Sequence, residues 1–222
     1  MTNLKLVTSK LSPFGHRVEM TLIEKNIAFE KVEVDLTNKP SWFVKDSPLG
    51  KAPILYCDDK VLFESIAICE YIEEISSSQP LHPQDQYLRA WNRGWIEFCN
   101  GLIASIFGIA MAQDEKNFQE KINETYQKIE VFEKHLNPNP FFNGESIALI
   151  DICFATAFVP MNHTQSTYGV ELFNEDSKIF KYLQKLIELE STKKAVPSDY
   201  NQVFKNFLQR KNSYLFQIHK KL

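Results

Sequence analysis

Apolar and polar positions follow two different periods along the first 76 residues, which predicts a mixture of strands and helices there. Short apolar or alternating runs predict strands, whereas apolar residues three and four apart predict helices. The expected strands are residues 4–8, 29–34, 53–57 and 60–63. The expected helices are residues 13–25, 40–45 and 64–75. The order is therefore βαβ, a short helix, ββ and a final helix, which predicts an α/β domain.

A polar stretch, Ser76-Ser-Ser-Gln-Pro-Leu-His-Pro83, follows this region and holds two prolines, so no helix continues through it. It predicts a linker at 78–86 between a domain of residues 1–77 and a domain of residues 87–222. The spacing beyond the linker is helical, and no strand alternation is visible. Helical patterns cover residues 88–102, 118–136, 151–158 and 179–189. The second domain is therefore expected to be all-helical, with Trp91 and Trp95 in its core.

Composition narrows the possible functions of the 222-residue chain. Hydrophobic residues make up 44% and charged residues 24%, and the net charge is −3, so nucleic acid is not an expected partner. There is no run of 18 apolar residues and no signal peptide, so we expect a cytoplasmic protein without a membrane span. The four cysteines form no Cys-x-x-Cys pair and have no histidine at metal-ligand spacing. They are expected to be reduced thiols, and no metal site is expected.

The most informative motif for chemistry begins at Ser12, between the end of a predicted strand and the start of a predicted helix. Serine is a favoured N-cap, and Pro13 stands at the first helical position, where proline is favoured. A helix start offers free N–H groups and a positive dipole end, which stabilise an anion. A thiolate is one such anion. The alternative is that Ser12 only caps the helix.

Four local motifs and the two-domain order together resemble the cytosolic glutathione transferase family. The motifs are Ser12-Pro-Phe-Gly-His-Arg-Val18, Asn38-Lys39, Pro48-Leu-Gly-Lys-Ala-Pro-Ile-Leu55 and Glu64-Ser-Ile-Ala-Ile68. The Ser-Pro-Phe segment is most similar to the tau class, and omega-class relatives carry cysteine in place of the serine. The resemblance covers essentially the whole chain. It implies a thioredoxin-like N-terminal domain and an all-helical C-terminal domain.

The resemblance implies that Ser12 is the catalytic residue. Its hydroxyl would donate a hydrogen bond to the sulfur of glutathione and favour the thiolate. Ser65 would receive the γ-glutamyl carboxylate at the start of a helix, and Glu64 would meet the ammonium group. The alternative is that Glu64 only ends a strand and Ser65 only caps a helix.

Three further elements of the glutathione site are implied by the same resemblance. Lys39 and Lys51 would engage the glycyl carboxylate, although each could instead be an ordinary solvated lysine. The Ala52-Pro53 bond would be cis, and the Ala52 backbone would pair with the cysteinyl part of glutathione like an added strand. A trans turn proline is the alternative.

The pocket for a second substrate is less defined by the sequence. Phe14, Phe107 and Met111 are candidates for its lining, and Phe14 could equally belong to the core. For Arg17 we expect an ion pair between the two domains rather than a ligand contact.

The function implied is conjugation of glutathione, activated as a thiolate, to a small hydrophobic electrophile, as in detoxification. Glutathione is then a co-substrate, no metal is required, and a homodimer is expected. An isomerase or peroxidase activity on the same scaffold is one alternative. A glutathione-dependent reductase is another, but that chemistry normally uses cysteine where this chain has Ser12. A non-catalytic interaction module remains a third possibility, because one fold hosts many functions.

Overall fold

The computed structural model describes residues 3–219, so residues 1, 2 and 220–222 of the predicted domains lie outside it. Contacts divide the chain into two compact units. The first comprises the chain up to Leu81 together with Glu190–Pro197, and the second comprises His82–Leu189 and the chain from Ser198 onward. The segment 190–197 thus packs with the N-terminal residues, although residues 87–222 were predicted to form the helical domain.

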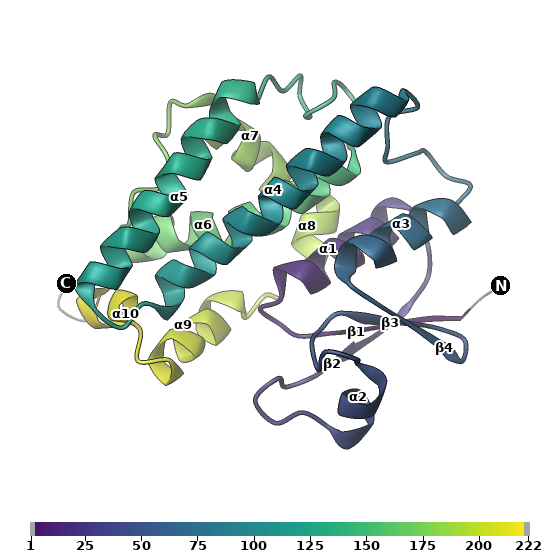
Figure 1. Cartoon of the computed structure of the whole chain (residues 1–222), viewed down its shortest axis with the longest axis horizontal. Helices are drawn as coiled ribbons and strands as arrows, with labels where there is room; N and C mark the ends of the chain where they lie inside the picture. The colour runs from purple at the N-terminus through teal and green to yellow at the C-terminus, as the bar shows by residue number, and fades with distance from the viewer. Residues whose placement is uncertain (1–2, 220–222) are drawn as a thin grey trace. The chain divides into compact units, whose positions relative to one another are not determined.

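The first unit is built on one four-stranded sheet with the strand order β2-β1-β3-β4 (Figure 1). The strands are β1 (Leu4–Thr8), β2 (Glu30–Glu33), β3 (Ile54–Cys57) and β4 (Lys60–Phe63). β1 runs parallel to β2 and antiparallel to β3, which runs antiparallel to β4. The predicted strands are confirmed, although β2 and β3 are shorter than expected.

Helices cover both faces of this sheet. α1 (Pro13–Glu24) and α3 (Ser65–Ile75) lie side by side on one face, and the short α2 (Ser41–Asp46) lies beyond the other (Figure 1). Phe43 of α2 is fully buried against Val7, Val34 and Ile54. This arrangement is the predicted thioredoxin-like fold.

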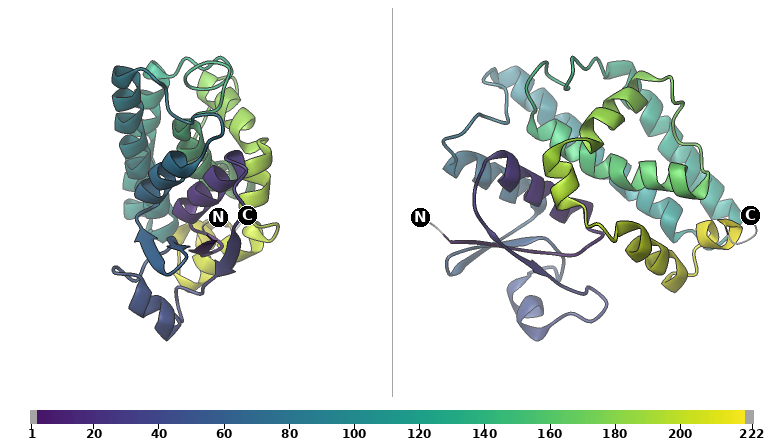
Figure 2. Two further views of the ribbon diagram at one scale, coloured as in Figure 1. Left: turned by 90° about the vertical axis from the view of Figure 1, so that its right-hand side faces the viewer. Right: turned by 180° about the vertical axis from the view of Figure 1, so that it is seen from behind.

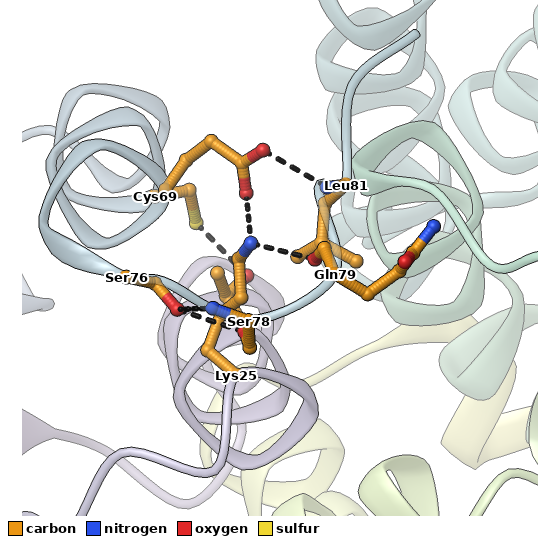
Figure 3. Close-up of polar contacts among 8 residues, drawn as sticks. Lys25, Cys69, Ser76, Ser78, Gln79 and Leu81 are labelled. Atoms are coloured by element: carbon orange, nitrogen blue, oxygen red, sulfur yellow. Dashed lines mark hydrogen bonds and ion pairs between the residues drawn. The ribbon is translucent and has the colours of Figure 1, made fainter.

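One buried ion pair joins the end of α1 to α3 and to the chain that follows it (Figure 3). The Lys25 ammonium lies 2.6 Å from Glu73 Oε2 and donates to the Gln79 carbonyl at 2.8 Å. The other carboxylate oxygen of Glu73 accepts the Leu81 N–H at 2.9 Å. Because Lys25 is almost wholly buried, the pair fixes the course of residues 76–81 over the first unit.

α8 (Glu190–Ala195) returns to the first unit from far along the sequence and packs on α1. The Thr192 hydroxyl reaches the sulfur of Met20 at 3.9 Å, and both residues are buried. Nothing in the local pattern around residue 190 predicts this return.

The second unit consists of helices, as predicted. They are α4 (Gln86–Met111), α5 (Glu115–His135), α6 (Leu149–Tyr168), α7 (Lys178–Ile187), α9 (Tyr200–Arg210) and α10 (Tyr214–His219). Seen from behind, α6 and α7 lie in front of α4 and α5 (Figure 2). No element after residue 189 was predicted from the sequence, whereas the structure forms α9 and α10 there.

The buried start of α6 shows how a missing cap is replaced. Ala148 occupies the N-cap position but has no side-chain acceptor. Asp151, fully buried three residues later, accepts the Ala148 N–H at 2.8 Å and the Phe142 N–H at 2.8 Å, and Tyr182 donates its hydroxyl to the same carboxylate. Half of a capping box is thus formed, and the helix begins without a serine or threonine at its N-cap.

α4 bears on two sequence expectations, the absence of a membrane span and the burial of Trp91 and Trp95. Among the described residues it is the one helix long and apolar enough, by length and composition alone, to qualify as a membrane span. Half of its most apolar window is buried inside the protein, and one such helix is weak evidence for a membrane span, because core helices of folded proteins pass the same test. Trp95 is buried as predicted, but Trp91 is 44% exposed, so the prediction of Trp91 as core is wrong.

Candidate functional site

The register of the sheet brings three of the sequence motifs to one edge. Val7 pairs with Ile54, so the end of β1 lies beside Pro53, which directly precedes β3. Ile54 also pairs with Phe63, so Glu64, directly after β4, lies at the same edge. Ser12 follows β1 by a short loop. The start of α1, the Ala52-Pro53 bond and the start of α3 therefore share one edge of the first unit.

Ser12 is the N-cap of α1, as predicted. Its backbone is extended, with φ −81° and ψ 105°, and its hydroxyl oxygen accepts the Gly15 N–H at 3.1 Å. The side chain is almost buried, at 9% exposure. Capping uses a lone pair of the oxygen and leaves the O–H available for donation to a ligand. Capping and catalysis are therefore compatible at this residue.

The Ala52-Pro53 peptide bond is cis, as the resemblance implies. The loop before it is closed by Ser47, whose hydroxyl accepts the Lys51 N–H and donates to the Lys51 carbonyl, each at 2.9 Å. Gly50 adopts the left-handed conformation (φ +58°), in which a side chain is disfavoured. These contacts fix the backbone that leads into β3.

Both predicted lysines are close to this loop, Lys51 by sequence and Lys39 by its ammonium group. Both Lys39 and Lys51 are exposed. A Cβ atom placed on Gly50 would lie 3.5 Å from the Lys39 ammonium nitrogen, so Lys39 lies beside the residue that precedes Lys51. Two cations at one loop favour a carboxylate there.

The start of α3 offers open hydrogen-bond donors. Glu64 occupies the N-cap position in a strained left-handed backbone conformation (φ +65°), and no side-chain cap is formed there among the described residues. The first N–H groups of the helix are therefore available to an external anion. Ser65, the first residue of α3, is buried, whereas Glu64 is exposed.

Arg17 of α1 is fully buried and donates to the Ser65 hydroxyl at 3.2 Å. Its guanidinium also lies 5.3 Å from the centre of the Phe14 ring. Because Arg17 can only donate, the Ser65 hydroxyl accepts from it and directs its own proton elsewhere. Sequence reasoning missed this contact, since the two residues are 48 positions apart. The predicted ion pair between domains stays a prediction.

The candidates for the second-substrate pocket belong to both units. Phe14 is half-buried in the first unit. In the second unit, the Phe107 ring stands edge-on to the ring of Phe207 in α9, with 6.3 Å between the ring centres. Met111, the last residue of α4, is 42% exposed. The pocket itself remains a prediction.

His16 lies one residue beyond Gly15 and is buried. Its Nε2 lies 3.0 Å from the Lys10 carbonyl oxygen, which can only accept, so Nε2 carries the proton. Burial, together with the positive charge of Lys31, lowers the pKa of His16 to about 4. The imidazole is therefore neutral near pH 7, and it ties the loop before Ser12 to the first turn of α1.

The four cysteines, all within residues 3–219, are buried, and no disulfide joins them. Across residues 3–219, no group of three or more His, Cys, Asp or Glu side chains could hold a metal ion.

Known proteins resemble this chain along most of its length. A family model described as the N-terminal domain of glutathione S-transferase matches residues 11–75. Glutathione S-transferases U1 and U6 of Arabidopsis thaliana are 30% and 31% identical to it. The matches span 90% and 87% of this chain and 92% and 89% of the relatives. The crystal structure of a tau class glutathione S-transferase from mango, Mangifera indica, superposes with a TM-score of 0.83 at 28% identity, covering 94% of this chain and 98% of that one. The chain belongs to the glutathione S-transferase family.

Proposed function

We propose that this protein binds glutathione at the sheet edge described above and conjugates it to a small hydrophobic electrophile. The observation that carries the proposal is the Ser12 hydroxyl, which caps α1 and keeps its proton for a ligand. A relative from rice has been crystallised in complex with glutathione, although at 22% identity it supports the fold alone.

The reaction requires few protein groups. The glutathione thiol loses its proton to solvent, and the hydrogen bond from Ser12 together with the dipole of α1 stabilises the thiolate. The sulfur attacks the electrophilic carbon, a C–S bond forms, and the leaving group departs with its electron pair. Binding both substrates side by side supplies the rest of the acceleration.

The tripeptide can be placed by charge and by backbone pairing. The γ-glutamyl carboxylate binds the open N-terminus of α3 and the Ser65 hydroxyl, and Glu64 receives the ammonium group. The Ala52 backbone pairs with the cysteinyl part. Lys39 and Lys51 receive the glycyl carboxylate. We also propose a cytoplasmic location, since buried cysteines that form no disulfide among residues 3–219 suit a reducing compartment.

Two measurements test this function. The protein is expected to be retained on immobilised glutathione and eluted by free glutathione. It is also expected to form a thioether from glutathione and a generic aryl halide such as 1-chloro-2,4-dinitrobenzene. Retention without turnover would favour an isomerase, a peroxidase or a binding protein, and the absence of both would favour the interaction module.

Exchange of Ser65 for alanine is expected to raise the KM for glutathione about tenfold to a hundredfold with little change in kcat. A hydrogen bond to a charged group is worth roughly 1.5–3 kcal/mol, and this one holds the substrate equally in the ground and transition states. Steady-state kinetics at varied glutathione concentration give both constants. Ser76→Ala, at the other end of α3, is the matched control. An unchanged KM for Ser65→Ala would contradict the placement of the γ-glutamyl carboxylate at Ser65.

Exchange of Ser12 for cysteine is expected to convert conjugation into disulfide exchange. A thiol at a helix N-terminus has a lowered pKa and attacks the glutathione sulfur of a mixed disulfide, which releases the other thiol. A second glutathione thiolate then attacks the new disulfide at position 12 and leaves as oxidised glutathione. Ser9→Cys, outside the cap, is the control in an assay with a small mixed disulfide. Equal rates for the two variants would place Ser12 away from the sulfur.

A homodimer is part of the proposal. Three large apolar side chains at the start of α4 are exposed, namely Tyr87, Leu88 and Trp91, and Trp91 lies near His135 of α5. Light scattering after size exclusion is expected to give the mass of two chains, and Trp91→Glu is expected to give one. Lys181→Glu, at an exposed position of α7, should stay dimeric. A wild-type protein that elutes as a monomer would contradict this part of the proposal.

A further inference from the structure

The packing between β1 and the first turn of α1 leaves no room for a side chain at position 15, three residues after Ser12. Thr8 ends β1 and is 1% exposed, and its hydroxyl has no hydrogen-bond partner among the described residues. Gly15 lies above it in the first turn of α1. A Cβ atom placed on Gly15 would lie 1.8 Å from Thr8 Oγ1 and 3.0 Å from Thr8 Cβ. The Thr8 hydroxyl thus fills the space that a side chain at position 15 would need.

Gly15 is also bonded to the proposed catalytic residue. Its N–H donates to the Ser12 hydroxyl oxygen at 3.1 Å, and a Cβ atom on Gly15 would lie 3.4 Å from Ser12 Cβ. Any displacement of Gly15 away from Thr8 would therefore change the position of the Ser12 hydroxyl. We propose that Thr8 and Gly15 form a size-matched pair that sets the position of Ser12, so that both are positioning residues for the thiolate.

Thr8 has little freedom to yield. Its side chain is β-branched, which restricts its rotamers. Its carbonyl accepts the Val34 N–H at 2.8 Å, and its backbone pairs with Glu33 in the sheet. The turn above it is held by the bond from the Ser12 N–H to the Ser9 carbonyl at 3.0 Å. A larger residue at position 15 must therefore move the first turn of α1 rather than the strand.

A double-mutant cycle in the full-length protein tests the pair without any assay of activity. Gly15→Ala is expected to lower the midpoint of urea unfolding, although glycine-to-alanine exchanges in open helix positions stabilise. Thr8→Ala in the same background is expected to restore most of the loss, because it removes the 1.8 Å contact. Thr8→Val keeps the bulk and should not restore it. Gly94→Ala in α4, where a Cβ atom meets nothing within 4 Å, is the control and should not lower the midpoint.

The positioning role rests on the proposed function and needs a second readout. The acidic limb of the pH profile of kcat/KM is expected to move to higher pH in Gly15→Ala. At a pH below the limb, kcat/KM should then fall about tenfold for each pH unit by which the limb moves. The double variant Thr8→Ala/Gly15→Ala should return to the wild-type limb. A structural loss alone would lower the amount of folded enzyme and leave the limb in place.

The outcomes separate the two ideas. If the changes in unfolding midpoint caused by Thr8→Ala and Gly15→Ala simply add, or if Gly15→Ala is as stable as the wild type, the proposed packing pair is wrong. If Gly15→Ala does not fold, recovery of folding and of the wild-type limb in the double variant supports the pair, and failure of both variants overturns it. Coupled midpoints with limbs that stay in place would overturn the positioning role. If the unfolding midpoints are coupled but the wild-type protein conjugates nothing, the proposed function is wrong and the packing pair still stands.

Discussion

Exchange of Ser12 for alanine is expected to lower the turnover number for conjugation by about tenfold to a hundredfold near pH 6.5. One hydroxyl donor beside a helix N-terminus lowers the pKa of a thiol by about one to two units, and each unit changes the thiolate fraction tenfold. The KM for glutathione should change much less, because the remaining contacts to the tripeptide are retained. Steady-state kinetics with an aryl halide separate the two constants.

The same exchange removes the cap of α1, so stability must be separated from chemistry. Alanine at an N-cap costs about 1 kcal/mol, whereas glycine costs only a few tenths. Ser12→Gly should therefore lose as much turnover as Ser12→Ala while it unfolds at nearly the wild-type urea concentration.

Ser177 offers a matched control in the second unit, because it caps α7 by accepting the Phe180 N–H at 3.2 Å. Ser177→Ala should lose stability and keep turnover. If turnover falls in proportion to the loss of stability across the three variants, Ser12 acts only as a helix cap.

Acid is expected to destabilise the folded protein through His16. The pKa of this imidazole is lowered by burial from 6.5 in the unfolded chain to about 4 in the folded one. Between these values the unfolded chain binds a proton that the folded chain does not, so the free energy of unfolding falls as the pH falls. The contribution is complete above pH 6.5 and is lost toward pH 4. The full loss is about 3 kcal/mol.

The measurement compares urea unfolding of the wild-type and His16→Gln proteins from about pH 7.5 to about pH 4. Glutamine can still donate to the Lys10 carbonyl but cannot be protonated, so the difference between the two proteins isolates the histidine. His219→Gln, at an exposed position, is the control and should follow the wild type. Parallel curves for wild type and His16→Gln would contradict the buried neutral imidazole.

Much of the fold was predictable because the period of apolar residues reports local structure directly. The strands and helices of residues 4–75 follow the alternation and the three-four spacing that predict them. The start of α1 at Ser12-Pro13 was equally predictable, because the residue preferences of the N-cap and of the first helical position are local. The periodicity of α4 did not distinguish Trp91 from Trp95, because it identifies an apolar stripe and not what covers each position.

Contacts between residues that are far apart along the chain could not be predicted from the sequence. Arg17 reaches Ser65 only because α1 and α3 lie on the same sheet face. The return of α8 to α1 joins Thr192 to Met20, and no local pattern encodes such a pairing. One overlooked feature did leave a local signal. Gly15 stands in the first turn of a helix, where glycine is unfavourable, and such a residue calls for a packing reason.

A crystal structure grown in abundant glutathione tests the central claim most directly. We expect the tripeptide along the edge formed by Ser12, Ala52-Pro53 and Ser65, with its sulfur within hydrogen-bond distance of the Ser12 hydroxyl oxygen. A tripeptide bound elsewhere, or one whose sulfur faces another group, would contradict it.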